Sequence, residues 1–278
     1  MIVPEHPSDA AGVAVHYDEL DPAYRRIWGD HVHHGYWRNG DETPEQAAAA
    51  LIGLVEQRLV LQPGLKLCDI GCGYGATAAD LLTRHDVSIV GLTVSPAQHR
   101  VARDRSPGFL CLLQDWLDNG LPSASFDRAY AIESSEHMVD KPRFFAEARR
   151  ILRPGGRLVV CAWLEGEGAR PWEVRHLLVP ICREGRLPSM GSRADYEQLA
   201  SDAGFRLVDY QDISREVRRT WSICLARLAR SMVTDSGIRR LALSQATQSR
   251  DFILSLPRLI LALRTGAMRY GLFQWEAV

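Results

Sequence analysis

The 278-residue chain is close to neutral, with 33 Lys and Arg against 34 Asp and Glu, and 46% of its residues are hydrophobic. A chain of this length and composition can bury a substantial core, and it suits one elaborated α/β domain better than two independent domains. Because the basic residues are dispersed and the net charge is near zero, the footprint of a nucleic-acid binder is missing. We therefore expect no nucleic-acid partner.

The cysteines and the apolar segments of the sequence bear on where in the cell the protein is expected. The six cysteines are scattered without a CxxC pair and several fall in apolar runs, which is typical of reduced core thiols. The first ten residues lack the basic and apolar regions of a signal peptide. The late apolar stretch from Phe252 to Leu263 is too short to span a bilayer and contains Pro257 and Arg258. These features predict a cytoplasmic protein without an integral membrane segment, and they leave a homo-oligomer open.

Periodicity and turn signals define a succession of strands and helices. Residues 1–45 are rich in aromatic residues and histidine, carry turn signals such as Asp21-Pro22, and predict a helical N-terminal extension. A helix follows from Glu45 to Leu61 and ends before Pro63-Gly64. Strands are expected at 65–70, 87–92, 109–113, 126–132 and 157–162, with helices between them at 76–84, 96–105 and 142–152. This alternation predicts a parallel sheet with right-handed crossovers and helices on both faces.

The remainder of the chain is less regular. A helix at 193–203 and a strand at 205–213 are followed by a mostly helical segment at about 214–266. The final segment, 267–276, alternates like a strand.

A glycine-rich turn, Asp69-Ile70-Gly71-Cys72-Gly73-Tyr74-Gly75, directly follows the first strand and opens a helix. Its glycines let a ligand approach the main chain, at the edge of an open α/β sheet where ligands bind. A dinucleotide site also fits the glycine spacing, but the second strand ends at 90–95 without the acidic residue that holds a ribose. The carboxylate of Asp69 instead suits the α-amino group of a bound amino acid. A turn without a ligand and a dehydrogenase site remain alternatives.

Other short segments, spread along residues 16–163, form one ordered set of motifs together with this turn. They are His16-Tyr17-Asp18, Ile27 to Trp37, Gly91 to Gln98, Gln114-Asp115-Trp116, Glu133 to Met138, and Leu152 to Gly156. With them the chain resembles class I S-adenosylmethionine-dependent methyltransferases, in the branch of γ-tocopherol and sarcosine/dimethylglycine methyltransferases. The resemblance implies a Rossmann-like, doubly wound, seven-stranded sheet, mostly parallel with an antiparallel last strand. It also implies one domain, with an N-terminal lid (1–45), a cofactor-binding core (46–163) and an acceptor-binding region with a helical insertion (164–278).

The same resemblance implies S-adenosylmethionine as cofactor, with S-adenosylhomocysteine as product, and assigns positions to it. The methionine portion and sugar would contact Asp69, Gly71 and Gly73. The ribose would be lined by Leu92, Thr93 and Gln98. The adenine would be held by Asp115 and Trp116. An N-terminal lid would comprise Tyr17, Trp28, His34 and Gly35, and Glu133 would complete the cofactor site.

Candidate catalytic groups follow the fourth strand. His137 is favoured as a base or orienting group because imidazole exchanges protons near neutral pH, and Glu136 and Tyr17 are further candidates. The structural alternative is that His137 only caps the helix that follows. The nearby cluster of His31, His33 and His34 has only Asp30 as an acidic neighbour, so we expect no metal; the aromatic residues around it favour a lid over a cationic sulfonium.

The acceptor is the least determined element. A group of arginines after Asp212 suggests either a solvated helix face or a site for an anionic acceptor such as a prenyl diphosphate; it comprises Arg215, Arg218, Arg219, Arg227, Arg230, Arg239 and Arg240. An amphipathic helix carrying Leu254, Leu256, Leu259, Ile260 and Leu263 would line the acceptor pocket, pack between subunits or touch a membrane. The hypothesis is metal-independent methyl transfer to carbon or nitrogen of an apolar, natural-product-like small molecule. The alternatives are C-methylation of a prenylated acceptor, and a binding or cyclisation protein that retains the cofactor without methyl transfer.

Overall fold

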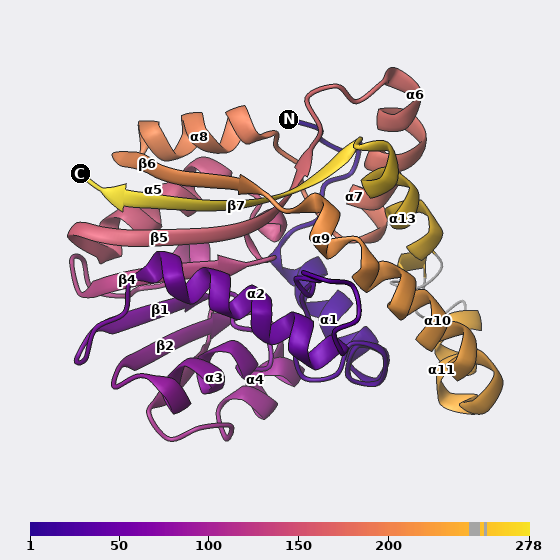
Figure 1. The fold of residues 1–278 in the computed structure, drawn as a ribbon, viewed down its shortest axis with the longest axis horizontal. Coiled ribbons are helices and arrows are strands. Elements are labelled where there is room, and N and C mark those ends of the chain that lie inside the picture. The colour runs from indigo at the N-terminus through magenta and orange to yellow at the C-terminus, as the bar shows by residue number, and fades with distance from the viewer. Residues whose placement is uncertain (245–250, 253–254) are drawn as a thin grey trace.

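A computed structural model describes residues 1–244, 251–252 and 255–278 and contains a seven-stranded sheet flanked by helices (Figure 1). The strands are β1 (Lys66–Ile70), β2 (Ser88–Thr93), β3 (Phe109–Leu113), β4 (Phe126–Ile132), β5 (Leu152–Glu165), β6 (Phe205–Asp212) and β7 (Met268–Ala277). The helices are α1 (Ala10–Ile27), α2 (Pro44–Leu59), α3 (Ala76–Arg84), α4 (Pro96–Ala102), α5 (Lys141–Ile151), α6 (Pro171–Glu173), α7 (Val179–Glu184), α8 (Arg193–Asp202), α9 (Ser214–Val217), α10 (Arg219–Thr234), α11 (Ser236–Leu243) and α13 (Leu256–Thr265). Leu254 lies outside the described residues.

The sheet has the strand order β3-β2-β1-β4-β5-β7-β6. The first five strands are parallel to their neighbours, and β7 runs antiparallel to both β5 and β6. The chain direction across the sheet reverses between β1 and β4, so the loops after these two strands flank a topological switch point, where ligands of such sheets bind. The predicted fold class is confirmed.

Each face of the sheet carries its own apolar core, because successive side chains of a strand point to opposite faces. On β5, Val159 and Cys161 belong to one buried cluster, while Leu158 and Val160 belong to the other. The helices α2 and α3 contribute to the first cluster, and α5 and α8 contribute to the second. This arrangement makes the sheet the central layer between two layers of helices.

Two local predictions were wrong. Asp21-Pro22 does not form a turn, since α1 continues through Pro22 to Ile27. Asp18 lies one turn before Pro22, and its carboxylate accepts from Ser95 Oγ at 2.5 Å and from the Ala97 amide at 3.1 Å, which ties α1 to the start of α4. The strand expected at 157–162 is also longer, because β5 pairs with β7 along Arg157–Glu165.

Helices far apart in the sequence gather beyond the carboxyl ends of the parallel strands, at the right of Figure 1. They are α1, α10, α11 and α13, and we call them the helical cap. Arg227 on α10 donates to the Ile27 carbonyl at the end of α1 at 2.7 Å, which joins the cap's N-terminal and C-terminal parts. On α13, Leu256, Leu259 and Leu263 are buried in the core.

None of the helices in the described ranges has the length and apolar character needed to cross a membrane. All six cysteines are buried and free.

The second core supplies a stability test. Phe145 on α5 is fully buried, with its ring 5.8 Å from Tyr196 and 5.4 Å from Trp275. We expect Phe145→Ala to lower the free energy of unfolding by about 3–5 kcal/mol, because it removes a buried ring and leaves a cavity. Leu110→Ala, at a side chain 56% exposed, should change it by less than about 0.5 kcal/mol. Denaturant unfolding measures both, and similar values for the two variants would contradict the described packing.

Candidate active site

A cavity of about 770 Å³, part of it open to solvent, lies at the switch point. Its walls come from α1 and from the loops after β1, β2, β3 and β4. Among the positions assigned from the sequence, it is lined by Tyr17, Gly71, Gly73, Leu92, Thr93, Gln98, Asp115, Trp116, Glu133 and His137. We call it the cofactor cavity.

The glycine turn shapes one wall of the cofactor cavity. Gly71 has φ +78°, and a Cβ there would lie 2.4 Å from Ser134 Cβ, so the loop after β4 can approach only a glycine. Ser134 Oγ donates to the Ile70 carbonyl, which fixes this approach. Gly73, at φ +55°, would direct a Cβ into open space. Its bare main chain leaves room for a ligand in contact with the backbone, as S-adenosylmethionine would require.

Asp69 lies just behind this turn and is not among the residues that line the cofactor cavity. Its side chain is 3% exposed, and Tyr130 Oη donates to its Oδ2 at 2.9 Å. Burial raises the pKa of Asp69 to about 7, although the Tyr130 hydrogen bond opposes the increase. A cationic group brought to this carboxylate would restore its ionised form.

The far end of the cofactor cavity carries paired polar side chains. Thr93 Oγ1 donates to Gln98 Oε1 at 2.8 Å, and both residues are buried. Asp115 accepts from the Leu117 amide at 2.9 Å and caps a short helix, Trp116–Asp118. The Trp116 indole donates to the Phe144 carbonyl at 3.2 Å. These bonds hold the walls in place before a ligand arrives.

A second cavity, of about 450 Å³, adjoins the first, and we call it the acceptor cavity. The two share Tyr17, Val32, Glu133 and His137. The rest of its wall is mainly aromatic and apolar, with His16, Tyr24, Trp28, Glu136, Trp163, Gly185, Leu187, Trp221 and Phe252. No Lys or Arg of the described residues lines it. Its chemistry therefore suits an apolar ligand with few polar groups.

Tyr17 and His137 meet at the shared wall, where Tyr17 Oη lies 2.9 Å from His137 Nε2. The other ring nitrogen, Nδ1, lies 3.3 Å from the Arg186 carbonyl, which can only accept. His137 therefore carries its proton on Nδ1 and presents Nε2 as the acceptor for the tyrosine hydroxyl. Burial lowers the pKa of His137 to about 4, so the ring is neutral at pH 7. His137 does not cap the following helix, because Asp140 accepts from the Arg143 amide there.

Glu133 carries a carboxylate that is 10% exposed and accepts from four donors. Its Oε1 accepts from the His34 amide at 2.6 Å and from Tyr270 Oη at 2.8 Å. Its Oε2 accepts from His34 Nδ1 at 2.9 Å and from the Trp163 indole at 3.0 Å. Burial alone would raise the pKa of Glu133, but the charge and hydrogen bonds of His34 outweigh it and lower the pKa to about 2. The group is ionised at pH 7.

Glu136 lines only the acceptor cavity. Its Oε1 accepts from the Trp163 amide at 2.6 Å, and burial raises its pKa to about 7. Three residues assigned to a cofactor lid lie away from the cofactor cavity. Trp28 lines the acceptor cavity, His34 binds Glu133, and Gly35 packs against α2, where a Cβ would lie 2.5 Å from Ala47 Cβ. Their contact with the cofactor stays a prediction.

Sequence reasoning missed several residues of the acceptor cavity. His16 was noticed only as part of a motif, yet its ring is 1% exposed, and its Nε2 lies 2.9 Å from Tyr24 Oη. Its Nδ1 has no hydrogen-bond partner among the residues that the structure describes. The sequence did contain a signal for His16, because this histidine directly precedes Tyr17, a candidate catalytic residue. Trp163 and Trp221 reach the cavity from distant parts of the chain, so no local pattern indicated them.

Within 1–244, 251–252 and 255–278, no three His, Cys, Asp or Glu side chains are placed to hold a metal ion.

A family model described as mycolic acid cyclopropane synthetase matches residues 5–238, most of the chain. The chain belongs to this family of class I S-adenosylmethionine-dependent methyltransferases. The predicted family, enzyme class and cofactor are thereby confirmed.

Two curated relatives of this family member are also methyltransferases. The chloroplastic tocopherol O-methyltransferase of Arabidopsis thaliana is 29% identical, covering 94% of this chain and 80% of the relative. The 27-O-demethylrifamycin SV methyltransferase of Amycolatopsis mediterranei (strain S699) is 30% identical, covering 87% of this chain and 88% of the relative.

Solved structures share the fold of this cyclopropane synthetase family member over nearly its whole length. The [4+2]-cyclase SpnF gives a TM-score of 0.80 at 26% identity, covering 100% of this chain and 99% of the other. The mycolic acid cyclopropane synthase CmaA1, complexed with SAH and CTAB, gives a TM-score of 0.84 at 24% identity, covering 98% and 99%.

The hydrogen bonds that Glu133 accepts can be tested by measuring the stability of a Glu133→Gln variant. Glu133→Gln provides one acceptor oxygen in place of two, so two of the four donors would face an amide N–H₂. The fall in the pKa from 4.5 to about 2 corresponds to about 3 kcal/mol of stability. Because the folded-state pKa is depressed, this stability is present above the unfolded-state pKa and disappears as the pH falls toward 2.

We therefore expect Glu133→Gln to lose about 3 kcal/mol at pH 7 and about 1.4 kcal/mol at pH 3. Denaturant unfolding at both pH values measures the difference. Glu167→Gln, at an exposed carboxylate, is the control and should be neutral at both. A loss in Glu133→Gln that does not depend on pH would show that the ionised carboxylate is not the source.

Proposed function

We propose that this enzyme methylates a hydroxyl oxygen of an apolar small molecule of natural-product type. The observation that carries the proposal is the Tyr17–His137 hydrogen bond at the wall that the two cavities share. A neutral imidazole paired with a hydroxyl can accept the proton that an alcohol or phenol must lose. Two further observations support it: the acceptor cavity is aromatic, and the rifamycin and tocopherol relatives carry O-methyl transfer in their names.

Within this proposal the glycine turn and Asp69 hold the methionine end of S-adenosylmethionine, with Thr93, Gln98 and Asp115 toward its nucleoside. The bound cofactor supplies an electrophilic methyl group on a sulfonium. The acceptor hydroxyl donates to Tyr17 Oη, and Tyr17 donates in turn to His137 Nε2. As the acceptor oxygen bonds to the methyl carbon and the carbon–sulfur bond breaks, the proton passes through Tyr17 to His137. The apolar walls exclude water and align the two reactants, which is the main source of rate in such a displacement.

The charges around the shared wall fit a cationic cofactor. Glu133 is ionised and faces both cavities, so it favours binding of a positive sulfonium. Tyr17 and Trp28 line the acceptor cavity, and aromatic rings attract cations. No arginine or lysine of the described residues opposes them in the acceptor cavity.

Other acceptors have less support. Transfer to carbon or nitrogen, as the sequence predicted, stays a prediction. Arg215, Arg218 and Arg219, which suggested a prenyl diphosphate, line a separate groove rather than the acceptor cavity. A protein that binds the cofactor and cyclises a substrate without methyl transfer is the second candidate, favoured by the likeness to the [4+2]-cyclase over the full chain.

Cofactor binding should depend on the ionisation of Asp69. Since burial raises its pKa to about 7, the free protein is protonated there below that pH, and the carboxyl group then lacks the charge that holds an ammonium group. We expect the dissociation constant for S-adenosylmethionine to rise by up to about tenfold per pH unit as the pH falls below about 7. Isothermal titration calorimetry measures it.

Asp69→Asn should bind more weakly and without this pH dependence. Asp104→Asn, at an exposed carboxylate, is the matched control and should behave like the unchanged protein. If Asp69→Asn kept the pH dependence, another group would be responsible. If the unchanged protein did not bind S-adenosylmethionine at all, the proposal would fail.

Methyl transfer tests the Tyr17–His137 pair. With S-adenosylmethionine carrying a labelled methyl group and a small-molecule extract of the source organism, labelled products report activity, and their NMR spectra show whether the methyl is on oxygen. We expect His137→Asn to lower kcat by about 100-fold or more, with a much smaller effect on cofactor affinity. The double variant with Tyr17→Phe should be little worse than His137→Asn alone, because the two residues act as one unit.

Tyr210→Phe, at a partly buried tyrosine on β6 remote from both cavities, is the control and should keep full activity. Additive losses in the double variant would argue against a shared proton path. Tight cofactor binding without any labelled product would favour the cyclisation candidate.

A further inference from the structure

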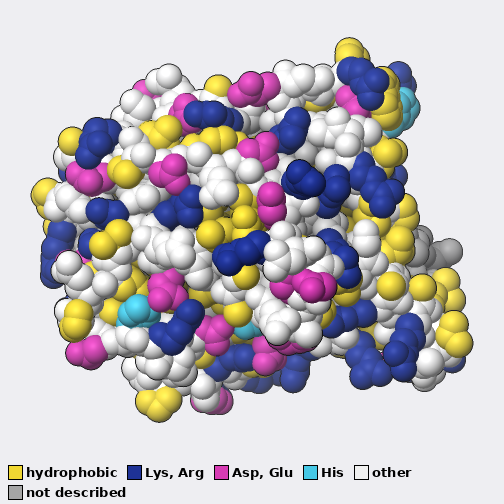
Figure 2. Space-filling view, viewed as in Figure 1, with side chains coloured by type: hydrophobic (Ala, Val, Ile, Leu, Met, Phe, Trp, Pro, Cys, Tyr) yellow, Lys and Arg dark blue, Asp and Glu magenta, His cyan; other side chains and the backbone are white. Residues whose placement is uncertain are grey.

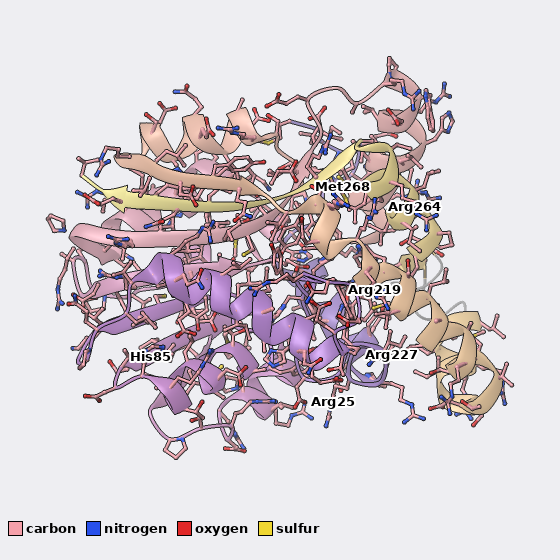
Figure 3. All side chains as sticks on the ribbon, in the orientation of Figure 1. Arg25, His85, Arg219, Arg227, Arg264 and Met268 are labelled. Atoms are coloured by element: carbon pink, nitrogen blue, oxygen red, sulfur yellow. The ribbon has the colours of Figure 1, made fainter. Side chains whose placement is uncertain are left out.

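Outside the two cavities, a large groove on the helical cap collects arginines. It runs between residues 37–40, α9, α10 and α13 and encloses about 1690 Å³, including space open to solvent. Its five basic residues are Arg38, Arg215, Arg218, Arg219 and Arg264. Figure 2 shows Lys and Arg side chains gathered over α9, α10 and α13 on this face. Figure 3 labels Arg219 and Arg264, which lie on the same side of the molecule and come from α10 and α13.

These arginines differ from their neighbours in lacking counter-charges. Arg269 pairs with Asp212 at 3.5 Å, and Arg227 pairs with Glu45 at 3.8 Å. None of the five groove arginines forms an ion pair with a carboxylate within the part of the chain that the structure describes. One acidic residue, Glu216, shares the groove with them. The chain as a whole has a net charge of −1, so this is a local concentration of positive charge.

Like charges held in one groove repel one another, and a bound anion offsets that repulsion. Guanidinium groups bind the oxygens of phosphate in a bidentate manner, and several together favour a multiply charged anion. The groove also offers non-ionic contacts. Arg219 lies over the Trp37 ring, 5.3 Å from its centroid, and Ile223 and Ile260 line the wall. A phosphate with an attached organic group matches this combination better than a bare ion.

The groove is separate from the acceptor cavity because α10 lies between them. Trp221 lines the acceptor cavity, whereas Ser222 and Ile223 on the same helix line the groove. Thr220 fixes the boundary, since its hydroxyl accepts from the Gly35 amide at 3.0 Å and from the Trp37 indole at 2.9 Å. A ligand in the groove is therefore not in position to receive the methyl group.

We propose that this arginine groove is a binding site for the phosphate group of a phosphate ester, distinct from the methyl-transfer site. The phosphate belongs either to a free phosphorylated small molecule or to a lipid headgroup. The site requires neither the cofactor nor the Tyr17–His137 pair.

Calorimetric titration of the full chain with inorganic pyrophosphate tests the proposal. We expect saturable binding that weakens as salt is added. Arg218→Gln combined with Arg264→Gln should weaken it about 10-fold or more, which is about 1.4 kcal/mol. Arg100→Gln combined with Arg230→Gln removes the same charge at exposed positions outside the groove and should leave the affinity unchanged. Both double variants should bind S-adenosylmethionine normally, which confirms that they fold and separates this test from that of the proposed function.

A second arm distinguishes the two sources. Sedimentation with phosphatidylglycerol vesicles, against phosphatidylcholine vesicles, assigns a lipid headgroup if the unchanged protein is retained and the groove variant is released. Pyrophosphate binding without vesicle retention assigns a free phosphate ester. Absence of saturable binding in both arms, or equal loss in the groove variant and its control, would overturn the proposal.

Discussion

The ionised carboxylate of Glu133 is the constraint on which the active site depends. It lies just after β4 at the switch point, in a left-handed backbone conformation with φ +54° that is uncommon for a residue other than glycine. Its four donors come from the N-terminal segment, β5 and β7, so a single side chain joins parts of the fold that are distant in sequence. Such strain persists only where surrounding contacts determine the conformation, and four charge-assisted hydrogen bonds do so here.

This network also holds the segment that carries His34 and Gly35 in place. His34 binds Glu133, and Gly35 packs closely on α2 and donates to Thr220. The segment therefore supports the site through Glu133, and its contact with the cofactor stays a prediction. The same segment leads to Trp37, whose ring lines the arginine groove. The two cavities and the groove thus share one structural support, although each has its own chemistry.

The parallel core could be predicted from the sequence because its signals are local. The limits of β3, β4 and α3 match the expected ranges, since turn residues and apolar runs define them within a few positions. Predictions failed where distant contacts decide the outcome. The length of β5 depends on pairing with β7, more than 100 residues later. The helix α1 continues through Pro22, and its Asp18 side chain bonds to Ser95 at the start of α4. The acceptor cavity was harder still, because Trp163 and Trp221 reach it only through the tertiary fold.

The weak basicity of His137 is compatible with its proposed role. A histidine whose pKa burial lowers to about 4 cannot remove a proton from an alcohol before reaction. Once the oxygen begins to bond to a methyl group, however, its proton becomes strongly acidic, and even a weak neutral base can accept it. Glu133 and Glu136 both line the acceptor cavity, so the imidazolium that forms stays near a carboxylate. The positive charge that enters with the sulfonium therefore moves to a ring in a cavity that Glu133 also lines, and this carboxylate offsets part of the cost of the buried imidazolium.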